Sequence, residues 1–180
     1  MSQILVIDIG GNSIKPALVS KTMQITEIDK LKSTRETRPK DLVDYIREKV
    51  LSLPNKVQSI VIGFPGVVKN NKIMAEPVNL GKGWKGYNWE RVFGLPVIIC
   101  NDAAMQAMGS YDKGRMLFLG LGYGLGTAIV DDGHLIPLEG GHMPFKKDKS
   151  FEDLCLSVLK NELVLQRCKL SAFVREHGSK

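Results

Sequence analysis

The stretch ILVIDIGGNSIKPALVS (residues 4–20) decides the fold, because it predicts two strands joined by a tight turn. Ile4–Ile9 is a continuous apolar run, which is typical of a strand buried on both faces. Ser13–Ser20 predicts its hairpin partner, in which Pro16 favours a sheet edge or a bulge because proline lacks a backbone N–H. The sequence therefore predicts that the fold starts from a β-hairpin whose first strand is buried in a sheet.

Two glycines occupy the turn of this hairpin, and a carboxylate stands at its mouth. Gly10 and Gly11 permit positive φ angles and let another group approach the backbone closely. That group is either a ligand, such as an anion held by backbone N–H groups, or only the next layer of the protein. Asp8 is likewise either a turn residue or a group that organises a hydrated metal ion beside phosphate.

Strands and helices alternate through the rest of the first hundred residues. A third strand is predicted near Ile25–Leu31, and the apolar positions of RPKDLVDYIREKVLSL (38–53) recur at helical spacing. SIVIGF (59–64) and PVIICN (96–101) predict two more buried strands, and a helix is predicted to begin at Asp102. This alternation predicts an α/β layer structure.

The pattern begins again after Gly109. RMLFLGLGYGLGTAIVDDGHLIP (115–137) predicts a strand, a glycine turn at 122–126, a second strand, an Asp-Asp-Gly turn and a third strand. Because this repeats the architecture of the opening, we predict two copies of one lobe, residues 1–112 and 113–180. The last thirty residues predict no further strand or glycine turn, so the second lobe is expected to be partial.

Composition and charge narrow the class of protein. Hydrophobic residues make up 43% and charged residues 24% of the 180 residues, as in globular proteins with a packed core. The net charge of +6 favours an anionic ligand such as phosphate, and a solvated basic surface is the alternative explanation. The chain has no block of like charge and no interleaved aromatic run, which argues against nucleic-acid binding.

Three cysteines, an odd number without CxxC spacing, argue against a disulfide framework and a structural zinc site. They are Cys100, Cys155 and Cys168. The sequence opens directly into a predicted strand, and no apolar run approaches membrane-spanning length. The sequence therefore predicts a cytoplasmic protein without a membrane partner.

Polar residues stand where an α/β sheet binds ligands. Asn101 and Asp102 end a buried strand and precede a helix. Asp102 is either a helix cap or a carboxylate that accepts a hydroxyl proton and prepares an attacking oxygen. LEGGHMP (138–144) places Glu139 and His142 three residues apart beside paired glycines, and a surface or hairpin role is the plain alternative for both.

The second glycine turn, GYGLGT (122–127), is followed by a strand rather than a helix, which argues against a dinucleotide-binding fingerprint. Two glycine turns in paired lobes would close over phosphates through their backbone N–H groups. Glu152 is an ordinary acid at a helix start, unless it points into the same pocket.

Five motifs occur in the order seen in the ROK sugar kinases: DIGGNSIKPALV (8–19), IGFPGVV (62–68), NLGKGWKGYNW (79–89), NDAA (101–104) and GLGYGLGTAIVDDGHLIPLEGGH (120–142). Over roughly residues 3–153 the chain resembles this family, and NLGKGW together with EGGH resembles its polyphosphate glucokinase branch. The resemblance implies an α/β, actin-like ATPase (ribonuclease H-like) fold of the actin-like/Hsp70-like superfamily, with a complete N-terminal lobe and the start of a second lobe.

The resemblance implies a role for individual residues. Asp102 resembles the catalytic base that takes the proton from the sugar 6-hydroxyl. Binding of sugar hydroxyls is implied for Gly66, Asn101, Asp102, Glu139, His142 and Glu152. Contacts to donor phosphates are implied for Asp8, Gly10, Gly11, Asn12, Lys15, Gly124, Gly126 and Thr127. Magnesium is implied as the cofactor of the donor, organised indirectly by Asp8.

The implied reaction is phosphorylation of the 6-hydroxyl of glucose or a related hexose, with polyphosphate or ATP as donor and Mg²⁺ as cofactor. Polyphosphate would need a basic track, and a solvated surface position is the alternative reading of each candidate lysine. The candidates are Lys82, Lys85, Lys146, Lys147 and Lys149.

Family members continue past this length into a Gly-rich adenosine-binding motif, which residues 143–180 do not resemble. We therefore expect a shortened C-terminus that affects ATP more than polyphosphate. Half a lobe is expected to leave an unpaired sheet edge and exposed apolar surface. A partner chain would cover such a surface, and a homodimer is the candidate assembly. The alternative function is a truncated, non-catalytic sugar-binding remnant of such a kinase.

Overall fold

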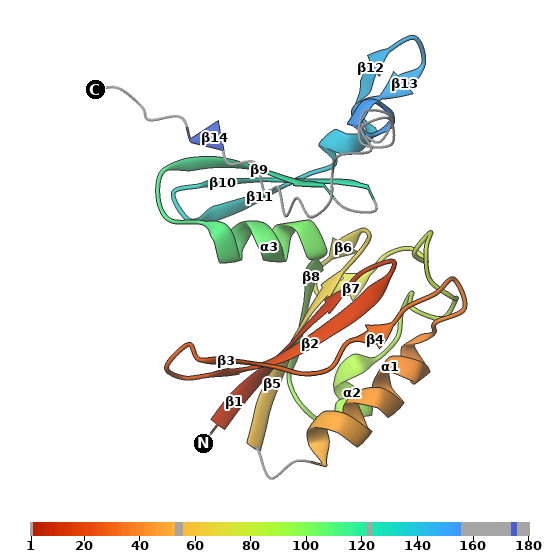
Figure 1. Cartoon of the computed structure of the whole chain (residues 1–180), viewed down its shortest axis with the longest axis vertical. Helices are drawn as coiled ribbons and strands as arrows, with labels where there is room; N and C mark the ends of the chain where they lie inside the picture. The colour runs from red at the N-terminus through yellow and green to blue at the C-terminus, as the bar shows by residue number, and fades with distance from the viewer. Residues whose placement is uncertain (1, 53–55, 122–123, 156–173, 176–180) are drawn as a thin grey trace. The chain divides into compact units, whose positions relative to one another are not determined.

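The computed structural model describes residues 2–52, 56–121, 124–155 and 174–175, and divides into two compact units, Met1–Asp102 and Ala103–Lys180 (Figure 1). Helix α3 (Asp102–Ser110) groups with the second unit, because Ala103 and Ala107 share a small core with the strands that follow. The division into functional lobes at residues 112 and 113 stays a prediction.

The first unit is built on a six-stranded sheet with the strand order β3-β2-β1-β5-β8, in which β4 also pairs with β2. The opening hairpin is confirmed, because β1 and β2 pair antiparallel. Strands β5 and β8 both run parallel to β1. The strands are β1 (Ser2–Ile9), β2 (Ser13–Ser20), β3 (Ile25–Glu27), β4 (Leu31–Lys32), β5 (Lys56–Phe64) and β8 (Val97–Asn101).

The third strand expected at Ile25–Leu31 is broken into β3 and β4, which pair with different parts of β2. Because β2 pairs with β1 on one side and with β3 and β4 on the other, it is not the edge strand that Pro16 suggested. Pro16 itself lies between the pairings with β3 and β4. The Pro16 carbonyl accepts the Ile28 N–H at 3.2 Å on this outer side. The N–H and C=O of one strand residue point to the same side, so the N–H that Pro16 lacks would also have pointed away from β1. It would have pointed to the stretch between β3 and β4, and its absence therefore costs no hydrogen bond to β1.

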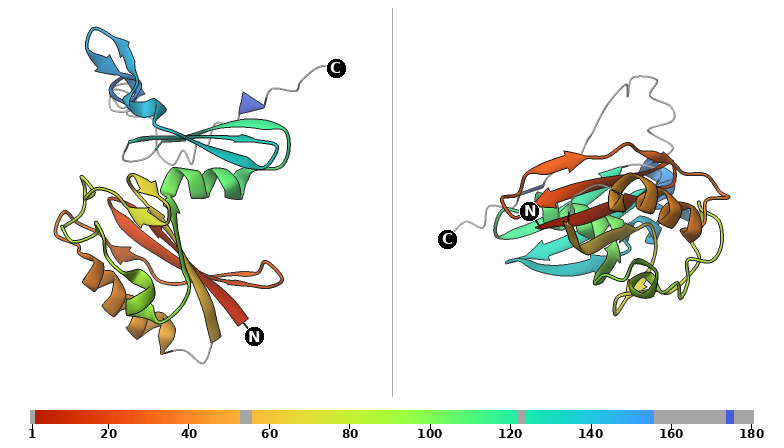
Figure 2. Two further views of the ribbon diagram at one scale, coloured as in Figure 1. Left: turned by 180° about the vertical axis from the view of Figure 1, so that it is seen from behind. Right: turned by 90° about the horizontal axis from the view of Figure 1, so that it is seen from below.

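Only one face of β1 is deeply buried in this unit, which corrects the expectation of burial on both faces. Leu5, Ile7 and Ile9 are fully buried, whereas Ile4 is 41% exposed. The helical segments that contribute to the core lie on this face: α1 (Pro39–Ile46), continued by the π-helical turn η1 (Arg47–Leu51), and α2 (Trp89–Phe93), as Figure 2 shows from two further sides.

The motif NLGKGW is anchored in this core by its backbone and its tryptophan. Gly81 N–H donates to the Thr37 carbonyl at 2.8 Å, and a Cβ at Gly81 would lie 2.7 Å from the Glu36 carbonyl oxygen. Trp84 is fully buried, and its ring centroid lies 5.6 Å from that of Phe64. Glycine at 81 is therefore required by close backbone approach.

The second unit is an antiparallel sheet with the order β11-β10-β9-β14, next to α3. Asp132 and Gly133, at the turn between β10 and β11, both have positive φ (46° and 81°), which confirms the predicted Asp-Asp-Gly hairpin. The strands are β9 (Arg115–Leu121), β10 (Leu125–Asp131), β11 (His134–Leu138) and β14 (Val174–Arg175).

Strand β14 corrects the expectation that the last thirty residues hold no strand, since it pairs antiparallel with β9 at Leu117 and Met116. The described part of this unit also contains the 3₁₀ turn η2 (Gly140–His142), the small hairpin of β12 (Pro144–Lys146) and β13 (Lys149–Ser150), and helical residues 151–155. Within the described parts of the chain, no helix is both long and apolar enough for a bilayer crossing.

Strand β8, which leads to Asn101 and Asp102, is the last strand of its sheet, and a side chain takes the place of a further neighbour. Asn71 follows the two-residue strand β6 (Val68–Lys69) and precedes β7 (Lys72–Ile73). Its amide donates to the Val97 carbonyl at 2.8 Å and accepts the Ile99 N–H at 2.6 Å. Asn71 therefore satisfies backbone groups that an edge strand leaves open.

We expect Asn71→Ala to lower the free energy of unfolding by about 1–2 kcal/mol more than Asn70→Ala, because only Asn71 bonds to β8. Both asparagines have positive φ (50° for Asn70 and 61° for Asn71), so both variants share the strain of a left-handed alanine. Urea denaturation measures the difference, and amide exchange at Ile99 should accelerate only in Asn71→Ala. Equal losses in the two variants would contradict this role.

Candidate functional site

The parallel pairing of three strands brings the sequence-predicted residues of the first unit to one edge of the sheet. Asp8 in β1 pairs with Gly63 in β5, and Gly63 pairs with Cys100 in β8. Carboxyl ends of parallel strands meet at the same edge, the edge at which open α/β sheets bind ligands. Asp8, Gly66 and the Asn101-Asp102 pair therefore gather at this edge, where the sequence by itself predicts only Asn101 and Asp102.

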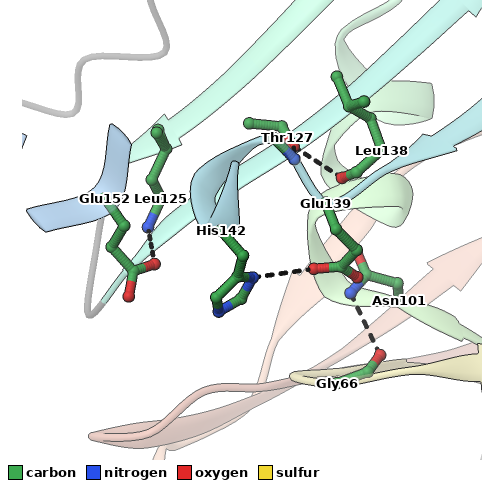
Figure 3. A network of polar contacts seen from close by, with 9 residues as sticks. Gly66, Asn101, Leu125, Thr127, Leu138, Glu139, His142 and Glu152 are labelled. Atoms are coloured by element: carbon green, nitrogen blue, oxygen red, sulfur yellow. Dashed lines mark hydrogen bonds and ion pairs between the residues drawn. The ribbon is translucent and has the colours of Figure 1, made fainter. Parts of the chain in front are cut away.

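A hydrogen bond joins two of the predicted sugar-binding positions. The Asn101 side-chain amide donates to the Gly66 carbonyl at 3.2 Å (Figure 3). Gly66 N–H in turn donates to the Phe64 carbonyl at 2.9 Å, and a Cβ on Gly66 would lie 3.1 Å from the Phe64 ring. This tight turn after β5 holds the Gly66 carbonyl where Asn101, directly before α3, can reach it.

Asp102 is the first residue of α3, and Asn101 stands at the position before it. A carboxylate in the first turn of a helix interacts favourably with the helix dipole. The position of Asp102 is therefore compatible with both of its predicted roles, that of a helix cap and that of a carboxylate that accepts a hydroxyl proton. Burial, and secondly the charge of Asp102, raise the pKa of the neighbouring Cys100 thiol. The carboxylate of Asp102 thus acts electrostatically on the strand end.

The first glycine turn is closed by backbone contacts and a buried serine. Gly10 N–H donates to the Ser13 carbonyl at 3.0 Å, and φ of Gly10 lies outside the left-handed region. Ser33, 4% exposed, donates its hydroxyl to the Gly10 carbonyl at 2.7 Å and its N–H to the Asn12 carbonyl at 3.2 Å. Sequence reasoning missed Ser33, since a single serine after a short strand carries no signal.

Asp8 is paired with a lysine across the hairpin. Lys15 Nζ lies 3.0 Å from Asp8 Oδ2, and 21% of the Asp8 side chain is exposed. Across residues 2–52, 56–121, 124–155 and 174–175, no group of three or more His, Cys, Asp and Glu side chains gathers in a way that could hold a metal ion. Mg²⁺ is commonly held by one or two carboxylates, water and substrate phosphates, and a single carboxylate such as Asp8 fits that donor set.

In the second unit, Glu139 and His142 lie side by side on the turn that follows β11. His142 Nδ1 is 3.5 Å from Glu139 Oε2, and both side chains are largely exposed (74% and 64%; Figure 3). The turn between them is η2, in which His142 N–H donates to the Glu139 carbonyl at 3.2 Å. An exposed carboxylate and imidazole at this spacing offer an acceptor and a donor to vicinal hydroxyls.

The described part of the second glycine turn is packed against protein groups. Leu125 N–H donates to Glu152 Oε2 at 2.8 Å (Figure 3). A Cβ on Gly124 would lie 2.5 Å from the same oxygen, and a Cβ on Gly126 would lie 2.8 Å from that of Ala103. Gly126 is thus required by close packing against α3, and the carboxylate of Glu152 lies against Gly124.

Thr127 makes two hydrogen bonds inside the second unit. Its hydroxyl donates to the Leu138 carbonyl at 2.6 Å (Figure 3). The same hydroxyl accepts the Gly140 N–H at 2.8 Å. Gly122 and Tyr123, in the same predicted turn, lie outside the described residues. The phosphate-binding roles of Gly124, Gly126 and Thr127 stay predictions.

This architecture is found in solved sugar kinases of the actin-like ATPase fold. The inorganic polyphosphate/ATP-glucomannokinase of Arthrobacter sp. strain KM matches with a TM-score of 0.69 and 23% identity, over 84% of this chain and 67% of that one. A ROK family glucokinase of Streptomyces griseus, solved with glucose and AMPPNP, matches with a TM-score of 0.66 and 25% identity, over 78% of this chain and 50% of that one. The predicted fold class is confirmed.

Residues 4–152 match the model of the ROK family, and the chain belongs to this family. An N-acetylmannosamine kinase of Salmonella newport is 29% identical over 147 residues, which cover 76% of this chain and 50% of the Salmonella protein. The chain spans about half the length of the curated relatives that it matches.

We expect the thiol of Cys100 to titrate above the pH range of an ordinary cysteine, so that iodoacetamide alkylates it slowly at neutral pH. Asp102→Asn removes one of the two causes, lowers the pKa and shifts the rate-against-pH profile to lower pH. Peptide-resolved mass spectrometry measures both profiles, with Cys155, also a free thiol, as the internal control. An unchanged Cys100 profile in a folded Asp102→Asn variant would contradict the electrostatic contact.

Proposed function

We propose that this chain phosphorylates the 6-hydroxyl of a hexose, with glucose as the acceptor and polyphosphate or ATP as the donor. The observation that carries the proposal is the end of β8, where Asn101 bonds to the Gly66 carbonyl directly before the carboxylate of Asp102. Membership of the ROK family supports sugar phosphorylation, since several of its named relatives are sugar kinases. Glucose and polyphosphate are the finer part of the proposal.

In the proposed mechanism Asp102 is the general base. Its carboxylate accepts the proton of the sugar 6-hydroxyl as that oxygen attacks the terminal phosphorus of the donor. The new O6–P bond forms while the bond from phosphorus to the leaving phosphate oxygen breaks, and the proton stays on Asp102. Positioning of the two reactants supplies most of the rate, because the transition state needs little covalent help from the protein.

Orientation of the acceptor is assigned to side chains that can bond to hydroxyls. The side chain of Asn101 is an amide, a group that can both donate to and accept from hydroxyls, and its N–H₂ donates to the Gly66 carbonyl. Glu139 and His142 supply an exposed acceptor and a ring N–H on η2. Glu152 is proposed with them from the resemblance, although its Oε2 accepts the Leu125 N–H in this structure.

Donor binding is proposed for the first glycine turn, Gly10–Lys15, with magnesium organised by Asp8 through water. Magnesium supplies neutralisation of the phosphate charge when bound. Lys15 is half exposed and pairs with Asp8, and in the proposal it adds a positive charge beside the donor phosphates. Exposed Lys146, Lys147 and Lys149 on the β12–β13 hairpin are candidate contacts for the longer polyphosphate chain.

The test is a coupled assay for glucose 6-phosphate, with glucose, Mg²⁺ and either ATP or polyphosphate. We expect Asp102→Asn to lower kcat by about 10²–10⁴-fold, because it removes the general base. Asp132→Asn is the matched control: it removes the same charge at an exposed turn position whose positive φ asparagine tolerates.

Equal loss in Asp102→Asn and Asp132→Asn would contradict the assignment of the base. Absence of turnover with both donors, together with a glucose-dependent rise in Tm, would instead favour the alternative, a non-catalytic sugar-binding protein. A homodimer and a cytoplasmic location stay predictions of the sequence.

A further inference from the structure

Both segments that carry the proposed sugar-binding residues of the second unit rest on the first three residues of β10, Leu125–Thr127. Thr127 bonds to the two residues that flank Glu139, and Leu125 N–H bonds to Glu152. A Cβ on Gly141 would lie 2.5 Å from the Leu125 carbonyl oxygen, so η2 also sits directly on this strand. One short stretch of strand thus seats Glu139, His142 and Glu152.

The hydroxyl of Thr127 is already committed as a donor. A threonine hydroxyl has a single proton, and here that proton goes to the Leu138 carbonyl at 2.6 Å. Phosphate oxygens need donors, so the Thr127 hydroxyl could serve a donor phosphate only by giving up this bond. With 8% of its surface exposed, the residue is also largely withdrawn from solvent. These observations argue against a phosphate contact through the Thr127 hydroxyl.

The same hydroxyl fixes the backbone on both sides of Glu139. Leu138 and Gly140 are the two neighbours of Glu139, and one oxygen atom bonds to the carbonyl of the first and the N–H of the second. A Cβ on Gly140 would lie 3.2 Å from Thr127 Oγ1, which explains a glycine at this position. Glu139 itself leaves the strand conformation (φ −101°, ψ 47°), as the chain turns into η2.

We propose that Thr127 is a positioning residue for the sugar-binding turn: its hydroxyl holds Glu139 and His142 in place and does not bind the phosphoryl donor. The part that concerns hexose affinity rests on the function proposed above. The geometric part does not, because it concerns the conformation of η2 in the chain without ligand.

The test compares Thr127→Val, which keeps the shape and removes the hydroxyl, with Thr127→Ser, which keeps the hydroxyl. We expect Thr127→Val to raise the Kd and KM for glucose about tenfold, as for the loss of one hydrogen bond, and to leave the KM of the donor within about twofold. Thr127→Ser should restore glucose affinity to within about threefold of the wild type. Calorimetry and the coupled assay give these values, and Tm is recorded for each variant.

A ligand-free readout keeps failure of the inference distinct from failure of the proposed function. In ¹H–¹³C spectra, the ring signals of His142 should move in Thr127→Val and return in Thr127→Ser, while those of His134 at the far end of β11 stay in place. Unmoved His142 signals, or a raised donor KM with unchanged glucose affinity, would overturn the inference. If the wild type binds no hexose, the proposed function fails, and the His142 signals alone decide the role of Thr127.

Discussion

The first unit depends on the parallel register of β1, β5 and β8. Because Asp8, Gly63 and Cys100 lie side by side in this ladder, the three strands end together. A shift of β8 by one residue would reverse the faces of its side chains and remove Asn101 from the Gly66 carbonyl. The apolar side chains of β1 and β5 hold the register through their burial under α1, and Asn71 closes the outer edge of β8.

Three described glycines of the two turns have close neighbours rather than unusual backbone angles. Gly10, Gly124 and Gly126 all lie outside the left-handed region, yet a Cβ on each would meet another group at 3.0 Å or less. At Gly10, Gly124 and Gly126, the group that approaches the backbone closely is therefore another part of the protein. The hydrogen bond from Ser33 to the Gly10 carbonyl holds the first turn in this conformation without a ligand.

The described residues of the two units form apolar cores of different size. The first has a large core with a chain of ring contacts through Phe64, Trp84 and Trp89. The described part of the second has a smaller core, formed by three alanines with Met116, Phe118 and Val130. Removal of a buried hydroxyl such as that of Thr127 leaves polar partners unpaired, which costs more than the bond itself contributes.

Apolar periodicity and glycine placement were enough to predict the opening hairpin, the strands that end at Phe64 and Asn101, the helix after Asn101 and the β9–β10–β11 meander, because these signals are local. Side-chain partners distant in sequence were not predictable: Ser33 on Gly10, Asn71 on β8 and Thr127 on Gly140 carry no local pattern. The sequence by itself determined these elements and the family motifs. Only the tertiary structure decided that Thr127 and Glu152 bond within the protein, because the fold alone determines which groups satisfy a buried hydroxyl or N–H.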